Sequence, residues 1–400
     1  MLRFPEFREA GEWQSTQLDD LIATITPPKK IPTTDYLPQG QFPIIDQGQS
    51  NIAGWTNDPE ALVETSQPLI VFGDHTCVLK LISRSFAQGA DGIKIIKGSG
   101  LADTAFLYQF LCYRPVVSEE YKRHFSILKT KVVAYPDRKS GEQQKIADCL
   151  ASLDELLTLE AQKLDTLKTH KKGLMQQLFP AESETLPKLR FPEFRDAREW
   201  EERELGPLTT KVGSGITPTG GDKNYKTKGR PFVRSQNVGW GELILNDVAF
   251  IGEETHQSFN STEIKVSDVL LNITGASIGR SAVADSRIAG GNVNQHVCII
   301  RAKQDELNPA LLNHFLISER GQKQIDSFQA GGNRQGLNFA QIRSFNIPLP
   351  PTESEQCRIA DCLASLDDLI TAQAQKLASL KTHKKGLMQQ LFPALDEVAA

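Results

Sequence analysis

The chain contains EQQKIADCLASLDELLTLEAQKLDTLKTHKKGLMQQLFPA at residues 142–181 and nearly the same stretch, EQCRIADCLASLDDLITAQAQKLASLKTHKKGLMQQLFPA, at residues 355–394. The copies agree at 32 of 40 positions. Each follows a second repeat, LRFPEFREAGEWQSTQLDDL at residues 2–21 and LRFPEFRDAREWEERELGPL at residues 189–208, with 12 of 20 identities. Self-similarity of this kind means that one structural unit occurs twice. We therefore predict a chain of two similar halves, each with a leader and a long repeat.

The long repeat carries a heptad pattern. With Ile146 at heptad position d, eight of the ten a and d positions are apolar in each copy, which strongly indicates two coiled-coil helices. The polar exceptions fall at equivalent places, Glu160 and Lys171 in the first copy and Gln373 and Lys384 in the second. The apolar core positions are Ile146, Leu150, Leu153, Leu157, Leu164, Leu167, Leu174 and Leu178 in the first copy, and Ile359, Leu363, Leu366, Ile370, Leu377, Leu380, Leu387 and Leu391 in the second.

These two helices most simply pair with each other. If a pseudo-two-fold axis relates the halves, the pairing is antiparallel and the segments between the repeats lie at opposite ends. Each helix spans about 33 residues between its outermost core positions, or roughly 50 Å, which matches on the order of 15 base pairs. We therefore expect the helices to act as a ruler that holds these two segments a fixed distance apart. A dimerisation or scaffold coiled coil without a ruler role is the alternative.

The segments between the repeats, here called the inserts, differ while the repeats agree. The copies are offset by 187 residues at the leader and by 213 at the helix, so the second insert is 26 residues longer. The net charge is −4, yet residues 22–141 hold 13 Lys and Arg against 11 Asp and Glu, and residues 209–354 hold 15 against 13. The two inserts differ in sequence and are slightly basic, whereas the repeats around them are nearly the same. This contrast indicates that the inserts carry a variable function. Neutral drift on a duplicated scaffold is the alternative.

Both inserts show short apolar strand patterns separated by glycine-rich turns, which predicts a mixed α/β fold. We expect two globular recognition domains separated by two long helices that form an antiparallel coiled coil. The expected divisions are a leader with the first domain at residues 1–141, the first helix at 142–181, a linker, leader and second domain at 182–354, and the second helix at 355–400.

Polar loops between the predicted strands supply the chemistry of DNA contacts. Asn and Gln bind adenine bidentately, Arg binds guanine, and Gly lets backbone N–H groups approach phosphate. The candidates in the first insert are Lys29, Lys30, Gln47, Gln49, Ser50, His75, Thr76, Lys80 and Lys94. In the second insert they are Thr217, Lys223, Asn224, Tyr225, Lys226, Arg234, Gln236, Asn237, Thr274, Arg280, Asn292, Asn294, Gln295, Asn333, Arg334 and Gln335. Taken singly, such loops are more often ordinary surface turns.

No catalytic constellation is evident. The sequence lacks a GxxxxGK[ST] phosphate loop and the Asn- or Asp-Pro-Pro-aromatic motif of amino-methyltransferases. Pro136-Asp137 followed by Glu142 and Lys145 resembles a PD…ExK nuclease cluster, but the Glu–Lys spacing is wrong. The six cysteines form no CxxC pair, so we expect no metal site. No stretch approaches about 20 apolar residues, so we expect no membrane contact.

Together these features resemble the specificity subunits of type I restriction–modification systems. The resemblance covers essentially the whole chain and rests on the twin leaders and helices together with shorter insert motifs. In the first insert these are IIDQGQ (44–49), VFGDHT (71–76) and GADG (89–92), and in the second SGITP (214–218), FVRSQNV (232–238), ITGASIGR (273–280) and NVNQHV (292–297). The second leader follows Leu186-Pro187-Lys188, which the first lacks, so we expect the native start to lie slightly upstream.

The resemblance implies two target-recognition domains, each reading one half of a split, asymmetric site in double-stranded DNA. It implies that the helices fix the spacer and dock two modification (methyltransferase) subunits, which restriction subunits then join. S-adenosylmethionine, ATP and Mg are expected on those partners, so this chain is expected to be non-catalytic, to bind no cofactor, and to work in a prokaryotic cytoplasm. The alternatives are a self-contained restriction nuclease or methyltransferase, and a coiled-coil scaffold whose inserts bind proteins.

Overall fold

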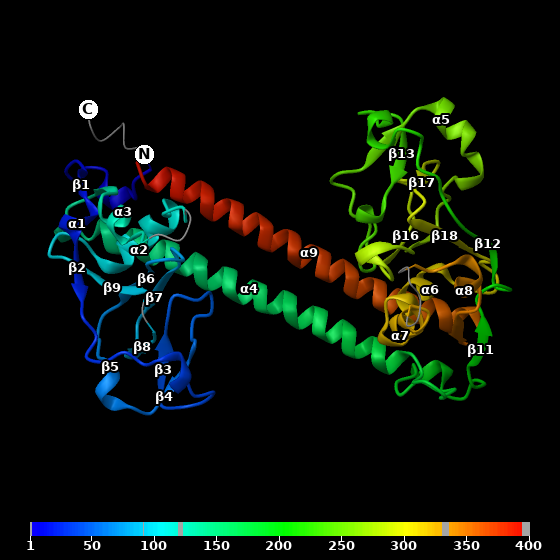
Figure 1. Cartoon of the computed structure of the whole chain (residues 1–400), viewed down its shortest axis with the longest axis horizontal. Helices are drawn as coiled ribbons and strands as arrows, with labels where there is room; N and C mark the ends of the chain where they lie inside the picture. Colours follow the sequence, from blue (N-terminus) through cyan, green and yellow to red (C-terminus); the bar gives the residue numbers. More distant parts are fainter. Residues whose placement is uncertain (1, 91, 119–122, 330–335, 394–400) are drawn as a thin grey trace. The chain divides into compact units, whose positions relative to one another are not determined.

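The computed structural model describes residues 2–90, 92–118, 123–329 and 336–393. It consists of two compact units, residues 1–162 with 375–400 (unit 1) and residues 163–374 (unit 2). Both predicted long helices are present, as α4 (Glu142–Leu178) and α9 (Glu353–Leu391) (Figure 1). Each unit therefore contains one insert together with part of each long helix.

Within each unit the two long helices run antiparallel. In unit 1, Lys384 Nζ of α9 donates to Asp154 of α4, and Lys376 Nζ donates to Glu160 Oε1 at 2.5 Å. In unit 2, Lys171 Nζ of α4 donates to Asp367 Oδ1 of α9 at 2.5 Å. Residue numbers thus rise along one helix as they fall along the other, as the repeats predicted.

The heptad positions lie on the sheltered sides of these helices. Every predicted a and d residue is buried or half-buried, including the polar exceptions. Glu160 and Lys171 are only 9% and 8% exposed, and each has an oppositely charged partner on the other helix. The charged breaks Glu160, Lys171 and Lys384 therefore form ion pairs between the helices, and such pairs fix register.

The leaders clamp the long helices in the same way in both units. In unit 1, Arg3 Nε donates to Glu142 Oε1 at 2.9 Å, and Leu2 N donates to the Gln390 carbonyl at 2.7 Å. The equivalent bonds in unit 2 are those from Arg190 Nε to Glu355 Oε1 at 2.7 Å, and from Leu189 N to the Gln177 carbonyl at 2.9 Å. The repeated leader sequence is thus a repeated contact.

The insert of unit 1 holds two four-stranded sheets. The first is antiparallel, in the order β2 (Ile22–Ile25), β9 (Ile93–Gly98), β6 (Leu69–Gly73) and β7 (Leu79–Ile82). The second has the order β4 (Gly54–Thr56), β3 (Phe42–Ile45), β8 (Phe86–Gln88) and β5 (Leu62–Val63), with β3 and β8 parallel. Outside these sheets lie the paired strands β1 (Gln14–Gln17) and β10 (Val132–Tyr135) and the helices α1 (Leu18–Leu21), α2 (Thr104–Tyr113) and α3 (Phe125–Lys129).

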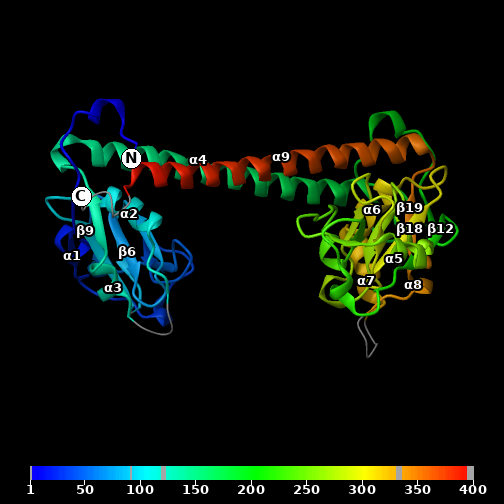
Figure 2. The same ribbon diagram turned by 90° about the horizontal axis from the view of Figure 1, so that it is seen from above.

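Helix α2 joins the first sheet of unit 1 to the long helices (Figure 2). Its side chains Phe106 and Phe110 share one apolar cluster with Phe72 of β6, Leu150 of α4 and Leu391 of α9. The run LIVFG of β6 is buried at all five positions, as expected for a central strand covered on both faces. The long helices therefore form part of the core of the unit.

The insert of unit 2 repeats this arrangement. Its four-stranded antiparallel sheet has the order β12 (Thr209–Ser214), β18 (Val297–Ala302), β15 (Val269–Asn272) and β16 (Ser281–Val283). A three-stranded sheet has the order β14 (Ala249–Ile251), β13 (Arg230–Val233) and β17 (Asn292–Val293), with β13 and β17 parallel. Further elements are β11 (Glu201–Glu204), paired with β19 (Asn346–Leu349), and the helices α5 (Glu253–Ser258), α6 (Pro309–Leu316), α7 (Glu319–Ser327) and α8 (Phe339–Arg343).

The two inserts, unlike in sequence, therefore share one topology. Their four-stranded antiparallel sheets correspond strand for strand, and so do the parallel pairs β3–β8 and β13–β17. The contact with the long helix also corresponds. Gln143 Oε1 accepts from Asp103 N at 2.7 Å, and Gln356 Oε1 accepts from Asn308 N at 2.8 Å, just before α2 and α6 respectively. The sequence motifs did not predict this correspondence.

Candidate nucleic-acid interface

The insert motifs of unit 1 meet at one place. Thr76 Oγ1, in the turn after β6, donates to the carbonyl of Gln47 at 2.7 Å in the loop after β3. Asp74 N donates to the Gly92 carbonyl at 2.7 Å, and Gly89 N donates to the Ile45 carbonyl at 2.9 Å. The IIDQGQ, VFGDHT and GADG motifs are thus neighbours in space, although up to 48 residues separate their ends in sequence.

A buried lysine holds the loop at residues 46–50. Lys80 is 4% exposed, and its Nζ donates to the carbonyls of Asp46 at 2.8 Å and Ser50 at 2.6 Å. Burial lowers the pKa of Lys80, and nearby Asp46 opposes that shift. This corrects the expectation that Lys80 contacts DNA, because its ammonium group is used inside the domain. Lys80 positions the loop instead.

Gly92 shows why GADG contains a glycine at this point. Its φ is +100°, a left-handed conformation that side chains rarely adopt. A Cβ added here would lie 2.7 Å from Gln47 Nε2. The side chain of Gln47 therefore packs directly over the Gly92 backbone, at the centre of the three motifs.

The other candidates of unit 1 differ in exposure. Lys29, Lys30, Gln49, Ser50, Thr76 and Lys94 are exposed, and Gln47 and His75 are half-buried. Lys29 Nζ donates to Asp58 at 2.6 Å, and Lys94 Nζ lies 5.6 Å from the centre of the Phe125 ring. In the loop that Lys80 anchors, the candidates Gln49 and Ser50 have exposed side chains, whereas Gln47 is half-buried.

The motifs of unit 2 converge in the same manner. Asn294 N donates to the Val233 carbonyl at 2.9 Å, and Gly215 N donates to the Asn294 carbonyl at 3.2 Å. Ile273 N donates to the His296 carbonyl at 3.0 Å. The segments SGITP, FVRSQNV, ITGASIGR and NVNQHV thus surround one site at the ends of β13, β15 and β17.

Three asparagines predicted to contact DNA are instead buried structural residues. Asn237, Asn292 and Asn294 are 1%, 0% and 7% exposed. The Asn237 amide donates to the carbonyls of Ile244 and Asp247 at 2.9 and 3.0 Å. Their amides shape the loops by bonding to the protein itself, and this corrects the expectation drawn from residue type alone.

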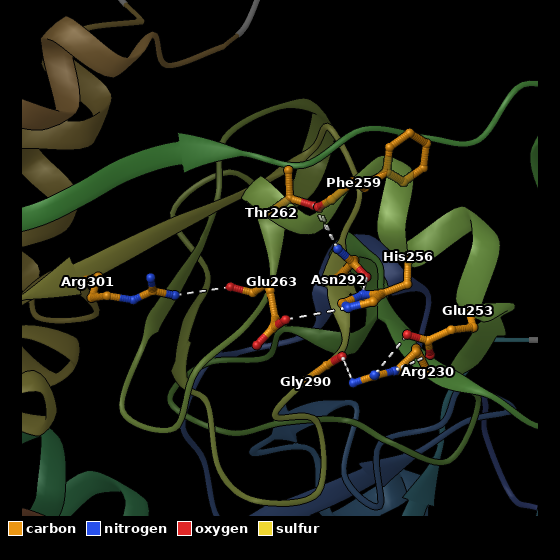
Figure 3. Close-up of polar contacts among 9 residues, drawn as sticks. All are labelled: Arg230, Glu253, His256, Phe259, Thr262, Glu263, Gly290, Asn292 and Arg301. Atoms are coloured by element: carbon orange, nitrogen blue, oxygen red, sulfur yellow. Dashed lines mark hydrogen bonds and ion pairs between the residues drawn. The ribbon is translucent and has the colours of Figure 1, made fainter.

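Asn292 lies in a buried network around α5 (Figure 3). Its Oδ1 is 2.7 Å from His256 Nδ1, and its Nδ2 donates to the carbonyl of Phe259 at 3.0 Å and to Thr262 Oγ1 at 2.9 Å. His256 Nε2 lies 3.5 Å from Glu263. Every hydrogen-bonding group of the Asn292 amide is therefore engaged, and the network anchors the start of the NVNQHV turn.

Arg234 is a half-buried candidate with an acidic partner. Its guanidinium lies 5.4 Å from the centre of the Tyr225 ring and donates to Asp247 Oδ2 at 3.2 Å. Gln236 Nε2 donates to the same carboxylate oxygen at 2.7 Å. Lys223, Asn224, Lys226, Gln236 and Gln295 are exposed, and Thr217, Tyr225, Thr274 and Arg280 are half-buried. The predicted residues Asn333, Arg334 and Gln335 lie outside the described residues.

One side chain in this site was not singled out from the sequence. His296 is half-buried, and its Nδ1 is 2.5 Å from Thr274 Oγ1. It lies in the NVNQHV motif, whose asparagines drew attention because of their chemistry. The signal that would have identified it is its place directly after Gln295 in a turn between two strands.

Other kinds of site are less evident. A cavity of about 1600 Å³ in unit 2 is lined by the end of α4, residues 180–188 and α7, and its lining residues do not include the predicted DNA contacts. Among the described residues, no group of three or more His, Cys, Asp or Glu side chains is arranged to hold a metal ion. In the same part of the chain, no helix has both the length and the apolar character needed to cross a membrane.

Comparisons with known proteins agree with the motifs. Residues 197–382 match the model of the type I restriction modification DNA specificity domain. The chain is 22% identical over 421 residues to the type I restriction enzyme MjaVIII specificity subunit of Methanocaldococcus jannaschii, covering 98% of this chain and 93% of that protein.

Solved structures show the same likeness. The chain is similar to the type I restriction–modification S subunit from M. genitalium, with a TM-score of 0.70 and 17% identity over 97% of this chain and 98% of that one. It is also similar to a chain from a study of complex assembly and conformational transition of the type I R-M system, with a TM-score of 0.53 and 16% identity over 98% and 99%. The specificity-domain match and the specificity-subunit relatives bear out the resemblance found in the sequence, and the solved structures bear out the mixed fold with two long helices.

Proposed function

We propose that this chain, a type I restriction–modification specificity subunit by family, reads a bipartite DNA site with one recognition domain for each half. The observation that carries the proposal is that both units gather unlike polar loops at the same place in one shared topology. The loops follow β3, β6 and β8 in unit 1, and β13, β15 and β17 in unit 2. Base contacts specify sequence, so equivalent positions with different side chains suit two readers of different half-sites.

The long helices are proposed to fix the spacer between the half-sites. Their copies align over 40 residues without insertion or deletion. The equivalent ion pairs Lys384–Asp154 and Lys171–Asp367 oppose any slip of one helix along the other. A fixed register gives a fixed helix length, which a ruler requires.

Catalysis is proposed to reside in partner subunits. Two modification subunits would dock on this chain and restriction subunits would join them, with S-adenosylmethionine, ATP and Mg bound to those partners in a prokaryotic cytoplasm. Leu156 and Leu159, one helical turn apart on α4, are 37% and 55% exposed, and Leu369 on α9 is 55% exposed. Exposed apolar side chains one turn apart on a helix, such as Leu156 and Leu159, are typical of protein–protein contacts, which supports docking along the helices.

Mapping methylated adenines tests the proposal directly. The full chain and its modification partner are expressed together in cells that lack other adenine methylation, and modified sites are located across the genome. We expect one gapped, two-part motif, with no modification by either protein alone. Lys223→Ala or Arg234→Ala, both in unit 2, should alter one half-site and leave the other unchanged. Modified sites without a gapped motif, or equal loss at both half-sites, would refute the two-reader proposal.

Affinity for DNA distinguishes this function from that of a protein-binding scaffold. A reader that contacts phosphates should lose affinity steeply as salt rises, with the logarithm of the binding constant linear in the logarithm of salt concentration. The complex of chain and modification partner is titrated with a duplex that carries the mapped motif and with a scrambled duplex. A scaffold would show neither a salt slope nor a preference between the duplexes.

A further inference from the structure

An exposed carboxylate lies beside the FVRSQNV motif of unit 2. Strands β13 and β14 are antiparallel, with Phe232 opposite Ala249, so Asp247 lies next to Arg234 where the motif leaves β13. The side chain of Asp247 is 80% exposed. DNA phosphates repel carboxylates, and protein surfaces that bind DNA are strongly positive. An acid at this place is therefore unfavourable for DNA binding unless it makes a specific contact.

Three side chains of the motif hold Asp247 in place. The Arg234 guanidinium donates to the Asp247 carbonyl at 2.8 Å and to Oδ2 at 3.2 Å. Gln236 Nε2 donates to the same Oδ2 at 2.7 Å, and Asn237 Nδ2 donates to the carbonyl at 3.0 Å. Four hydrogen bonds from one motif therefore fix both the backbone and the carboxylate of a residue whose side chain is exposed.

These contacts leave one oxygen of the carboxylate open. Oδ2 accepts both side-chain hydrogen bonds, whereas Oδ1 accepts none within the described residues. An ionised carboxylate accepts hydrogen bonds and cannot donate them. Asp247 thus presents one fixed acceptor, without a neighbouring donor of its own, at the surface where the motifs of unit 2 meet.

The four bases differ in what they offer to such an acceptor in the major groove. Cytosine offers the N4 amino group, which is a donor. Adenine offers its N6 amino group beside the acceptor N7, and guanine and thymine offer carbonyl oxygens. A carboxylate is repelled by these carbonyl oxygens and by N7. A lone fixed acceptor therefore matches cytosine.

We propose that Asp247 is a specificity-determining residue of unit 2 and that its Oδ1 accepts a hydrogen bond from cytosine N4 in one half-site. Arg234 and Gln236 are positioning residues, because they hold Oδ2 and so aim Oδ1 outward. This inference rests on the proposed function, since it assumes that the loops of unit 2 face DNA.

The corresponding position of unit 1 is apolar, which restricts the inference to one half-site. Gly54 of β4 lies opposite Ile44 of β3, and Ile52 stands two residues before Gly54, as Asp247 stands two residues before its own paired position in β14. Ile52 is half-buried and packs against a core cluster of unit 1. Reading in unit 1 must therefore depend on other side chains.

The experiment compares variants of the full chain expressed with the modification partner, with methylated adenines mapped in each. Asp247→Ala should reduce the preference for one C·G pair in one half-site by roughly 5- to 150-fold, the range for one mismatched base pair. Gln236→Ala should weaken the same position less, because Arg234 still holds Oδ2. Affinity of the Asp247→Ala complex for a scrambled duplex should not fall, since the substitution removes a negative charge.

Asp247→Asn gives the sharper test. In this variant the donors of Arg234 and Gln236 hold the amide oxygen, so the amide N–H group takes the outward position. A donor then replaces the acceptor at the same place. The preference at that pair should therefore invert, from cytosine to guanine or thymine on the same strand. A merely structural or electrostatic role of Asp247 would relax the position without inverting it.

Two controls separate this contact from its neighbours. A C·G pair also presents guanine, which Arg234 could read through N7 and O6. A duplex with 7-deazaguanine at that position should bind the wild-type complex as tightly as the ordinary duplex, whereas a loss of affinity would assign the contact to guanine and overturn the inference. Glu254→Ala removes another exposed acid of unit 2, in α5 after the far end of β14, and should leave the motif unchanged.

Other outcomes would also overturn the inference. These are an unchanged motif in Asp247→Ala, an A·T pair at the relaxed position, and a change spread evenly over all sequences, the last indicating an effect on phosphate contacts. Failure of the proposed function looks different, because the wild-type chain itself would then yield no gapped motif.

Discussion

The two units anchor polar loops by different means at the same end of the corresponding parallel strand pairs, after β3 in unit 1 and after β17, the counterpart of β8, in unit 2. In unit 1 the ammonium group of Lys80 binds two carbonyls of the loop after β3. In unit 2 the amides of Asn292 and Asn294 hold the turn after β17. By contrast, Gln143 and Gln356 make the same contact between insert and long helix in both units. The difference shows that the frame depends on particular paired residues, whereas an insert loop needs only some internal anchor that suits the ends of its strands.

Glu355→Ala is expected to have the largest effect and to reveal an asymmetry within the matched frame. The buried Glu355 carboxylate accepts from Arg190 at 2.7 Å and from Trp200 Nε1 at 3.1 Å. Glu142 accepts from its own leader arginine, but Trp13 Nε1 has no hydrogen-bond partner among the described residues. Breaking a buried ion pair costs about 3–5 kcal/mol. We expect that loss of unfolding free energy for Glu355→Ala, and a smaller loss for Glu142→Ala, in urea titrations.

A surface pair provides the control for this comparison. Arg287 and Asp285 form an ion pair at 2.7 Å with side chains 62% and 43% exposed. Exposed pairs contribute about 0–1 kcal/mol, so Asp285→Ala should change stability little. Equal losses for Glu355→Ala and Glu142→Ala would contradict the asymmetry, since the additional bond from Trp200 would then contribute nothing.

Acid sensitivity is expected to differ between the units because equivalent helix positions hold different residues. His314 in α6 is the sixth residue after the N-cap Asn308, and Gln109 in α2 is the sixth after the N-cap Asp103. Burial, with a smaller contribution from Lys171, lowers the pKa of His314 to about 3, from an ordinary value near 6.5. The folded chain therefore keeps this imidazole neutral where the unfolded chain protonates it.

The sign of the effect follows from that difference. Between pH 6.5 and pH 3 the unfolded state binds the additional proton, so stability falls as the pH falls, by about 1.4 kcal/mol per pH unit at most. Relative to pH 7, at pH 5 the wild type should lose up to about 2 kcal/mol more than His314→Gln, measured by urea unfolding. The reciprocal variant Gln109→His should introduce a similar sensitivity into unit 1. Identical pH profiles for wild type and His314→Gln would show that His314 is not the responsible group.

The sequence predicted the two long helices well, because the buried positions of a helix recur at a regular interval. The heptads located the sheltered positions of α4 and α9, and the equivalent polar breaks at Lys171 and Lys384 became ion pairs between the helices. The shared topology of the two inserts could not be seen in the sequence. A strand requires only apolar residues at its buried positions, and many sequences satisfy that requirement. The β6 run LIVFG and the β15 run VLLN are both fully buried, yet they share little sequence.

The candidate site was predicted at the level of motifs but not of side chains. All of the quoted insert motifs converge in their own units, yet Asn237, Asn292 and Asn294 point inward. A loop has no period that tells inward from outward positions, and amide groups serve equally well as anchors and as readers. Only the three-dimensional contacts separate Asn294, which fixes the turn, from Gln295, which is exposed.

Lys80→Met is expected to have a modest effect on stability and a local effect on function. The substitution leaves the carbonyls of Asp46 and Ser50 without the donor that now binds them at 2.8 and 2.6 Å, at a cost of about 1–3 kcal/mol. The loop with Gln49 should then lose its fixed shape, so one half-site of the methylation motif should become less selective. Lys80→Arg, which keeps the charge and donors, should retain more selectivity than Lys80→Met. If Lys80→Met instead relaxed the half-site read by unit 2, the assignment of this loop to a separate reader would be wrong, because Lys80 binds carbonyls of the loop after β3 in unit 1.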